Sequence, residues 1–141
     1  MTELAERNIS ARFEREINRF VVFASRHGNP VLYHNRRASA RIHRSTPVLF
    51  TRIDDGPGAD HPATLYNVSN DGVAFYCDHG LPAGAVLAVK LFWKESESSR
   101  VPAIVRHCEI TQQGFLVGAQ FAVHHHGACD LIESLAHTWY D

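Results

Sequence analysis

After Pro30 the sequence alternates between apolar and polar residues in six short stretches, which are separated by residues that favour turns. Side chains on a β-strand point alternately to opposite faces, so this alternation predicts strands that each bury one face. The predicted strands cover residues 38–53, 62–68, 72–77, 85–94, 101–111 and 114–122. Several short strands at this spacing favour an antiparallel barrel or sandwich, and a closed barrel leaves no strand edge exposed.

The fourth and sixth stretches show the alternation most clearly. In the fourth, one face carries Ala85, Leu87, Val89, Leu91 and Trp93. In the sixth, one face carries Phe115, Val117, Ala119 and Phe121. We expect both strands to supply the core of the barrel with these faces.

A long helix is predicted before the strands, over residues 3–26. Its apolar residues recur at helical spacing and form a stripe of Ile9, Phe13, Ile17, Phe20 or Val21, and Ala24. Gly28 and Pro30 supply the glycine and the proline that commonly follow the end of a helix. At 1.5 Å per residue the helix would be about 36 Å long, which is more than a small barrel needs for closure.

The stripe has to be buried on its own barrel, on a second copy or on a partner protein, because exposed apolar side chains forgo stabilisation. The strands already supply a core, so we expect part of the stripe to be available to another chain. A homodimer or a docked downstream protein that depends on residues 3–26 is the resulting prediction. The chain is therefore divided into an N-terminal helical arm (1–30), a barrel (31–127) and a C-terminal helix packed on or beside the barrel (128–141).

The C-terminal helix is predicted near residues 128–140, where Leu131, Leu135 and Trp139 form an apolar stripe. Just before it, the run His124-His125-His126 cannot direct three side chains to one metal from a strand, because neighbouring side chains alternate faces. We interpret the run as a polar junction between a strand and a helix, and we expect no metal.

Cys77, Cys108 and Cys129 are odd in number and widely spaced. This pattern matches neither a disulfide framework nor a Cys-x-x-Cys metal site. We expect the three thiols to be reduced and mostly buried.

The composition indicates a single globular domain of 141 residues, of which 45% are hydrophobic and 21% charged. The formal net charge of −1 argues against a protein that coats DNA or RNA, because such a domain would be strongly basic. No stretch approaches the roughly 20 apolar residues that span a membrane, and the first residues lack the apolar core of a signal peptide. We therefore expect a cytoplasmic protein that binds neither DNA nor RNA.

Positive charge is nevertheless concentrated in one part of the chain, because seven arginines and no carboxylate lie between Glu16 and Asp54. Within this part, Arg36, Arg37 and Arg41 form an Arg-Arg-x-x-x-Arg motif. The planar guanidinium group can donate two parallel hydrogen bonds to a phosphate or a guanine edge, or stack on a base. Without a second motif, the cluster could equally be a solvent-exposed basic segment that leads into a strand.

A second motif, Asn-x-Ser-x-x-Gly, follows 26 residues after Arg41 and consists of Asn67, Ser69 and Gly72. In a strand, Asn67 and Ser69 would face the same side, where the amide can meet a guanine edge and the hydroxyl a phosphate. Gly72 would permit a positive φ and the close approach of a ligand. The alternative is a β-turn over residues 70–72 that Ser69 closes.

The two motifs in this order resemble those of the PilZ domain family, bacterial receptors for cyclic di-GMP. Residues 116–121 are similar to the family's final-strand pattern, and the resemblance covers roughly residues 36–123. It implies a mainly β fold: a six-stranded antiparallel PilZ-type β-barrel, here with a long N-terminal helix and a short C-terminal helix. It also implies that cyclic di-GMP binds to Arg36, Arg37, Arg41, Asn67, Ser69 and Gly72, and that Arg36 can help to bind a stacked ligand dimer.

Other residues could contribute to such a site. Arg44, Arg52 and Arg106 could add to the positive field. Gly118 could permit the close approach of backbone in the last strand, although ordinary barrel curvature explains it equally well.

The leading prediction is a cyclic di-GMP receptor in which the ligand draws the arginines onto the barrel and reorients the N-terminal arm. The first alternative is a PilZ-like protein-interaction domain that binds no nucleotide. A single-stranded nucleic-acid module would need aromatic residues among the basic ones, and residues 34–52 contain only Phe50. The sequence contains no Walker-type phosphate loop and no Gly-x-Ser-x-Gly motif, so we expect a binding module and not an enzyme.

Overall fold

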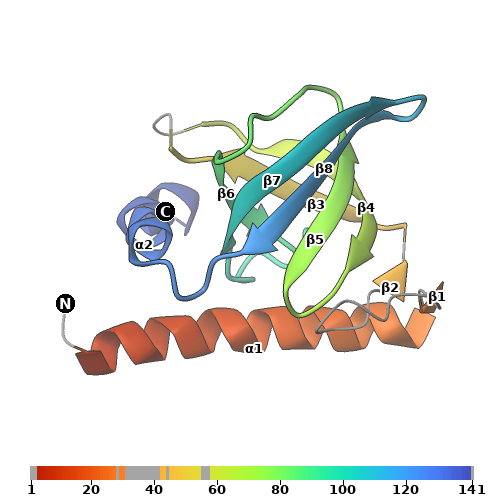
Figure 1. Cartoon of the computed structure of the whole chain (residues 1–141). Helices are drawn as coiled ribbons and strands as arrows, with labels where there is room; N and C mark the ends of the chain where they lie inside the picture. The colour runs from red at the N-terminus through yellow and green to blue at the C-terminus, as the bar shows by residue number, and fades with distance from the viewer. Residues whose placement is uncertain (1–2, 28, 31–41, 44, 55–57, 141) are drawn as a thin grey trace.

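The computed structural model describes residues 3–27, 29–30, 42–43, 45–54 and 58–140. Within them the chain forms a long helix α1 (Glu3–His27), a set of strands and a second helix α2 (His126–Tyr140) (Figure 1). The strands are β1 (Asn29–Pro30), β2 (Ile42–His43), β3 (Pro47–Arg52), β4 (His61–Val68), β5 (Gly72–Cys77), β6 (Val86–Lys90), β7 (Val101–Thr111) and β8 (Gly114–Phe121).

Six of the strands close into a barrel. They follow the order β4-β3-β6-β7-β8-β5, and β5 pairs back onto β4, so the ring is complete. Every neighbouring pair is antiparallel. The predicted mainly β fold, a six-stranded antiparallel barrel with a helix at each end of the chain, is confirmed.

The first predicted strand, 38–53, is not continuous in the described residues. Its last part is β3, which pairs with β4 through Pro47 to Phe50, while β2 pairs with β4 at Asn67 and Val68. Both lie along one edge of β4 because β5 occupies the other edge. Between them, the carbonyl of Thr46 still accepts a hydrogen bond from the amide of Leu65 at 2.8 Å.

The fourth predicted strand, 85–94, is too long. The ladder between β3 and β6 stops at Lys90, which pairs with Leu49. Continued in the same register, the ladder would place Leu91 opposite Val48 and Phe92 opposite Pro47, which has no N–H to donate. The chain turns away there, and Trp93, predicted to share the core face, is 40% exposed.

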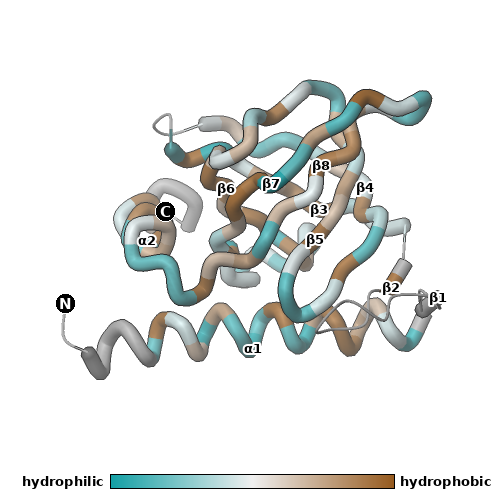
Figure 2. The backbone as a smooth tube through the Cα atoms, in the orientation of Figure 1, coloured by the Kyte–Doolittle hydropathy of each residue, from teal (hydrophilic) through white to brown (hydrophobic). Residues whose placement is uncertain are grey.

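The barrel interior is filled by apolar side chains from each of its strands, among them Phe50, Leu65, Phe75, Leu87, Val105 and Val117. Helix α1 runs beneath the barrel in the view of Figure 1. Its residues Phe13, Ile17, Phe20 and Ala24 are at most 3% exposed and belong to the same hydrophobic cluster as the barrel interior. Figure 2 shows these hydrophobic positions recurring along α1 between hydrophilic ones.

The burial of this stripe bears on the expected use of the arm. We expected part of the stripe to be available to another chain, because the strands already supply a core. Instead, the chain's own barrel covers it, and Phe20 packs edge-on against Phe92 at a centroid distance of 5.2 Å. The argument from an unburied stripe to a homodimer therefore loses its premise.

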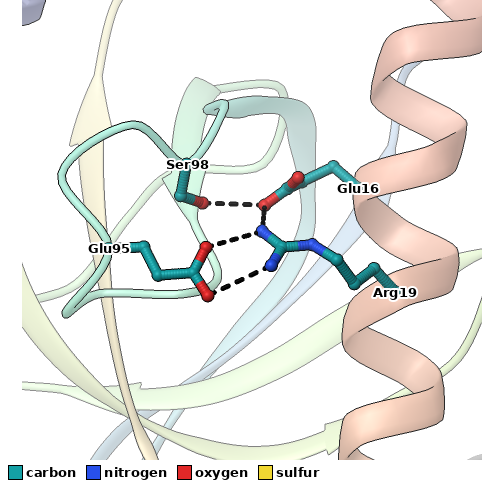
Figure 3. A network of polar contacts seen from close by, with 4 residues as sticks. All are labelled: Glu16, Arg19, Glu95 and Ser98. Carbon is teal, nitrogen blue, oxygen red and sulfur yellow. Dashed lines mark hydrogen bonds and ion pairs between the residues drawn. The ribbon is translucent and has the colours of Figure 1, made fainter.

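A polar network also fastens α1 to the segment that connects β6 and β7 (Figure 3). Arg19 donates from both terminal nitrogens to the carboxylate of Glu95, at 3.1 and 2.9 Å, and also to Glu16 at 2.8 Å. The hydroxyl of Ser98 donates to the same oxygen of Glu16 at 2.7 Å. The guanidinium carbon of Arg19 lies 3.8 Å from the centroid of the Phe92 ring, so this arginine contacts both the polar and the apolar part of the segment.

Helix α2 begins at the histidine run, as the interpretation of a polar junction requires. The amide of Ala128 donates to Nδ1 of His125 at 3.0 Å and so receives a partner in the first turn. Ala128, Cys129 and Ile132 are buried, whereas the predicted contacts Leu131 and Leu135 are only partly buried.

The three cysteines are free, with Cys77 and Cys129 buried and Cys108 half-buried, as predicted. Burial raises the pKa of the Cys129 thiol to about 11, which keeps it protonated near neutral pH. Neither helix, over the residues described, is long and apolar enough to cross a membrane.

The packing of α1 predicts that the helix stabilises the barrel. Phe20→Ala should lower the free energy of unfolding by about 3–5 kcal/mol, because it leaves a cavity where a fully buried ring packs between helix and barrel. Urea denaturation measures this change. Val22→Ala on the same helix is the matched control, because Val22 is 52% exposed, and it should change stability by less than about 0.5 kcal/mol. Equal stability of the Phe20 variant and the wild type would contradict the docking of α1.

Candidate functional site

The second predicted motif lies where β4 turns into β5. Asn67 is near the end of β4, Ser69 follows that strand, and Gly72 begins β5. The predicted ligand-binding residues Arg36, Arg37 and Arg41 lie outside the described residues. The structure therefore describes the surroundings of the second motif directly. It describes those of the arginine motif only through strand β2, which follows it.

Strand β2 directly follows the arginine motif in the sequence. Its first residue, Ile42, pairs with Val68, and His43 pairs with Asn67. The pairing of β2 with β4 thus joins the segment that begins one residue after Arg41 to the strand that carries Asn67.

The register of the barrel places Asn67 on its outer face. Across β4, β5, β8 and β7, Asn67 pairs with Ala74, Ala74 with Gly118, and Gly118 with His107. Cross-strand partners share a face. The adjacent row of Leu65, Phe75 and Val117 fills the interior, so the row that contains Asn67 points outward.

A β-bulge in β4 produces this orientation. The register between β4 and β5 shifts between Leu65 and Asn67, which leaves Tyr66 as the extra residue. Strict alternation from the buried Leu65 would have turned Asn67 inward and Val68 outward. With the bulge, Val68 is fully buried and Asn67 lies on the outer face, because a bulge re-aims the side chains that follow it.

Ser69 closes the turn between β4 and β5. Its amide donates to the carbonyl of Gly72 at 2.9 Å, and its hydroxyl accepts a hydrogen bond from the amide of Asp71 at 3.1 Å. Ser69 is only 3% exposed. The alternative interpretation of this residue, a side chain that closes a β-turn, is therefore correct as a description of its contacts, and it leaves a role in ligand binding untested.

Gly72 is required by a close approach of two strands and not by its φ angle. Among the described glycines, only Gly84 and Gly114 have positive φ, so Gly72 does not use the positive φ that glycine permits. A Cβ atom at residue 72 would lie 2.6 Å from the carbonyl oxygen of Ala119 on β8. Only glycine lets β5 begin this close to β8 without a shift of the backbone.

The outer face next to Asn67 carries small residues on β5 and Gly118 on β8. Gly72, Ala74 and Gly118 lie side by side on β5 and β8, and Gly72 pairs with Gln120. The far side is formed by β7, where His107 lies over Gly118 so closely that a Cβ there would be 2.2 Å from the imidazole ring. We call this surface the outer platform and define it by Asn67, Gly72, Ala74, Gly118 and Gln120.

Arg52, which was predicted to add to the positive field, is engaged elsewhere, and so is Arg100. Arg52 donates to both carboxylate oxygens of Asp54 at 2.8 and 3.1 Å. Arg100 is buried and donates to both oxygens of Asp60 at 2.5 and 3.0 Å. These hydrogen bonds hold the pKa of Asp54 and of Asp60 below the usual value of a carboxyl. Arg44, also proposed for the field, lies outside the described residues.

A cavity of about 410 Å³ separates the turn after β4 from helix α1. Asn70, Asp71 and Gln120 line it from the barrel, and Glu14 and Asn18 line it from the helix. The turn that Ser69 closes therefore faces the arm across this cavity. In the described part of the chain, no group of three or more His, Cys, Asp or Glu side chains is placed to hold a metal ion.

The close approach at Gly72 generates a prediction. Gly72→Ala should destabilise the fold by about 1–3 kcal/mol, because the added methyl group meets rigid backbone of β8. Urea denaturation measures this loss. Gly127→Ala is the control, because its Cβ would meet only the movable ring of His125, at 3.3 Å, in the first turn of α2. It should be neutral or stabilising, since alanine favours a helix over glycine. Equal stability of both variants and the wild type would contradict the packing role of Gly72.

Comparisons with known proteins agree with this fold. No protein in the curated set matches the sequence. Among solved structures, the K. pneumonia MrkH–c-di-GMP complex is similar with a TM-score of 0.50 and 14% identity, covering 74% of this chain and 52% of that one. The Bacillus subtilis inhibitor of motility (MotI/DgrA) has a TM-score of 0.47 and 17% identity, with coverage of 74% and 52%. The PilZ domain of YcgR from Escherichia coli with c-di-GMP has a TM-score of 0.44 and 16% identity, with coverage of 74% and 94%.

The match therefore spans about half the length of MrkH and of the motility inhibitor. The family model named PilZ domain matches residues 35–136, which is most of the sequence and includes both motifs, every barrel strand and most of α2. The chain belongs to the PilZ domain family.

Proposed function

We propose that this protein is a receptor that binds cyclic di-GMP on the outer platform and transmits binding to helix α1. The observation that carries the proposal is the pairing of β2 with β4. It brings the segment next to the arginine motif beside Asn67, although Arg41 and Asn67 are 26 residues apart in the sequence.

The outer platform suits a flat, anionic nucleotide. Gly72 and Ala74 place little side-chain bulk over the backbone of β5, and the amide of Asn67, which is 7% exposed, has the donors and the acceptor to pair with a guanine edge. The arginines proposed to bind, Arg36, Arg37 and Arg41, would supply forks for phosphates and guanines and planes for stacking. A lysine would supply the charge without the fork or the plane.

Membership of the PilZ domain family supports this assignment. MrkH, whose structure contains c-di-GMP, shares the fold with this chain, and we carry its ligand over as part of the proposal. Binding, with no chemical step, is the activity proposed. The alternative is a protein-interaction domain of the same fold that binds no nucleotide.

The proposed binding site predicts a role for the arginine motif. Arg37→Ala and Arg41→Ala should each weaken cyclic di-GMP binding by at least about tenfold, because each removes charge-assisted hydrogen bonds worth roughly 1.5–3 kcal/mol. Isothermal titration calorimetry of the full chain measures affinity and stoichiometry. A stoichiometry of two ligands per chain that falls to one in Arg36→Ala would support the stacked dimer proposed for Arg36.

Arg15→Ala is the control for these variants, because Arg15 is exposed on α1 and its loss changes the net charge equally. Cyclic di-AMP is the control ligand, because adenine presents a donor where guanine presents the O6 acceptor. Absence of cyclic di-GMP binding by the wild type would favour the interaction domain. Binding that survives in both Arg37→Ala and Arg41→Ala would refute the site.

The proposed movement of α1 has to be small. Exposing Phe13, Ile17 and Phe20 would cost about 1.5–3 kcal/mol each, or roughly 5–9 kcal/mol together. A ligand of micromolar affinity has about 8 kcal/mol of binding free energy in all. We therefore propose a shift that keeps the apolar stripe covered and breaks polar contacts such as the Arg19–Glu95 ion pair, in which both side chains are about half exposed.

The cavity beside α1 connects the proposed site to the arm. The turn held by Ser69 lines the cavity that faces α1, so a ligand that reshapes the turn alters the surface on which the helix lies. A ligand can shift this equilibrium only by binding the two positions of the helix with different affinities.

A variant that weakens the docked position should therefore bind ligand more tightly. Glu95→Gln removes the charge that pairs with Arg19 and should raise cyclic di-GMP affinity by up to about fivefold, since exposed pairs contribute about 0.2–1 kcal/mol. Calorimetry measures it, with Glu97→Gln in the same segment as the control. Lower affinity in Glu95→Gln would mean that the ligand favours the docked helix.

The remaining expectations stay predictions. They are a cytoplasmic location, a downstream protein partner, a homodimer through the arm, and domain boundaries at 30 and 127. Sedimentation of the full chain with and without cyclic di-GMP would test the homodimer. Because the apolar stripe is buried, we propose that such contacts use the solvent-facing side of the docked arm.

A further inference from the structure

Strand β7 borders the outer platform on the side opposite Asn67, and it carries a β-bulge there. The register between β7 and β8 shifts between Val105 and His107, which leaves Arg106 as the extra residue. Its Nε donates to Oε1 of Gln120 on β8 at 3.0 Å. Gln120 is the ladder partner of Gly72, the last residue of the second motif. The side chain of Arg106 therefore extends from β7 over β8 towards Gly72.

Among the residues that the structure describes, Arg106 forms no ion pair. Arg52 and Arg100, the other barrel arginines in the described part of the chain, each donate to both oxygens of a carboxylate. Arg106 is exposed, and its partner among the described residues is the neutral amide of Gln120. Because Nε makes that bond, the terminal nitrogens keep their forked pair of donors for another acceptor.

The distances suit a small anion that lies on the outer platform. Asn67 and His107 are three strand spacings apart, or about 14 Å at about 4.8 Å per spacing. Arg106 already reaches β8, so its guanidinium group is about one further spacing from β5. Gly72 and Ala74 have no side chain large enough to separate a bound molecule from the arginine, whereas the ring of His107 covers Gly118.

From this arrangement we propose that Arg106 binds a phosphate of the cyclic dinucleotide, on the side of the ligand opposite Asn67. This inference rests on the proposed function and adds a cation that neither motif contains. We assign a phosphate as the acceptor because Arg106 offers a forked pair of donors on a positive charge that no described carboxylate pairs with. Gln120 acts as the residue that positions this guanidinium group.

The test is calorimetry of the full chain with cyclic di-GMP. Arg106→Gln should lower the affinity about 10- to 100-fold, the equivalent of losing one or two hydrogen bonds to a charged group. Arg106→Lys keeps the positive charge for the phosphate and should lose less affinity than Arg106→Gln. Arg15→Gln makes the same change in net charge on the exposed surface of α1 and should bind like the wild type.

The outcomes separate this inference from the proposed function. If the wild type binds cyclic di-GMP and Arg106→Gln binds equally well, the inference is wrong and the proposed function stands. If Arg106→Lys is as weak as Arg106→Gln while both unfold at the wild-type urea concentration, the contact is not to a phosphate and the assignment fails. If the wild type does not bind cyclic di-GMP, the proposed function itself fails, and the inference fails with it.

Discussion

Strand β4 pairs with three other strands, and the rest of the structure depends on this. Its pairing with β5 closes the barrel, and its other edge is shared by β3 and β2. Antiparallel pairing uses the hydrogen-bonding groups of both strands, so β4 has no free edge over most of its length. The pairing of β2 with β4 also brings the segment that begins one residue after Arg41 beside Asn67. One strand thus takes part both in the closure of the barrel and in the arrangement of the proposed site.

Two β-bulges then decide what the outer platform presents. The bulge at Tyr66 turns Asn67 outward while Val68 enters the core, and the bulge at Arg106 adds an arginine to the facing side. Each bulge leaves one residue outside the ladder, which costs pairing but changes the direction of the neighbouring side chains. Between them, Gly72 and Gly118 are glycines for steric reasons, since backbone of β8 and the ring of His107 occupy the space of a Cβ. The small residues of the outer platform therefore follow from packing that the fold requires.

Helix α1 contributes to stability and limits the signalling mechanism at the same time. Its aromatic residues share the core of the barrel, so a complete release of the helix would cost most of what a micromolar ligand can supply. Its polar ties are weaker: Arg19 and Glu95 are about half exposed, and the hydrogen bonds of Arg19 lower the pKa of Glu95. Exposed ion pairs of this kind contribute little to stability. A small shift that exchanges such ties is the movement that the energetics of this interface permit.

The sequence by itself determined the fold class, the long first helix, the histidine junction before α2 and most strand positions, because these follow from local periodicity and turn residues. It also pointed to Asn67, Ser69 and Gly72, although it did not separate the turn from the ligand site. Only the tertiary structure decided that the α1 stripe is covered by its own barrel, that the ladder of β6 ends at Lys90 and leaves Trp93 outside it, and that bulges turn Asn67 and Arg106 to the outer face. The physical reason is that a residue's face and its available space depend on which strand lies beside it. In a barrel that neighbour is often far away in the chain.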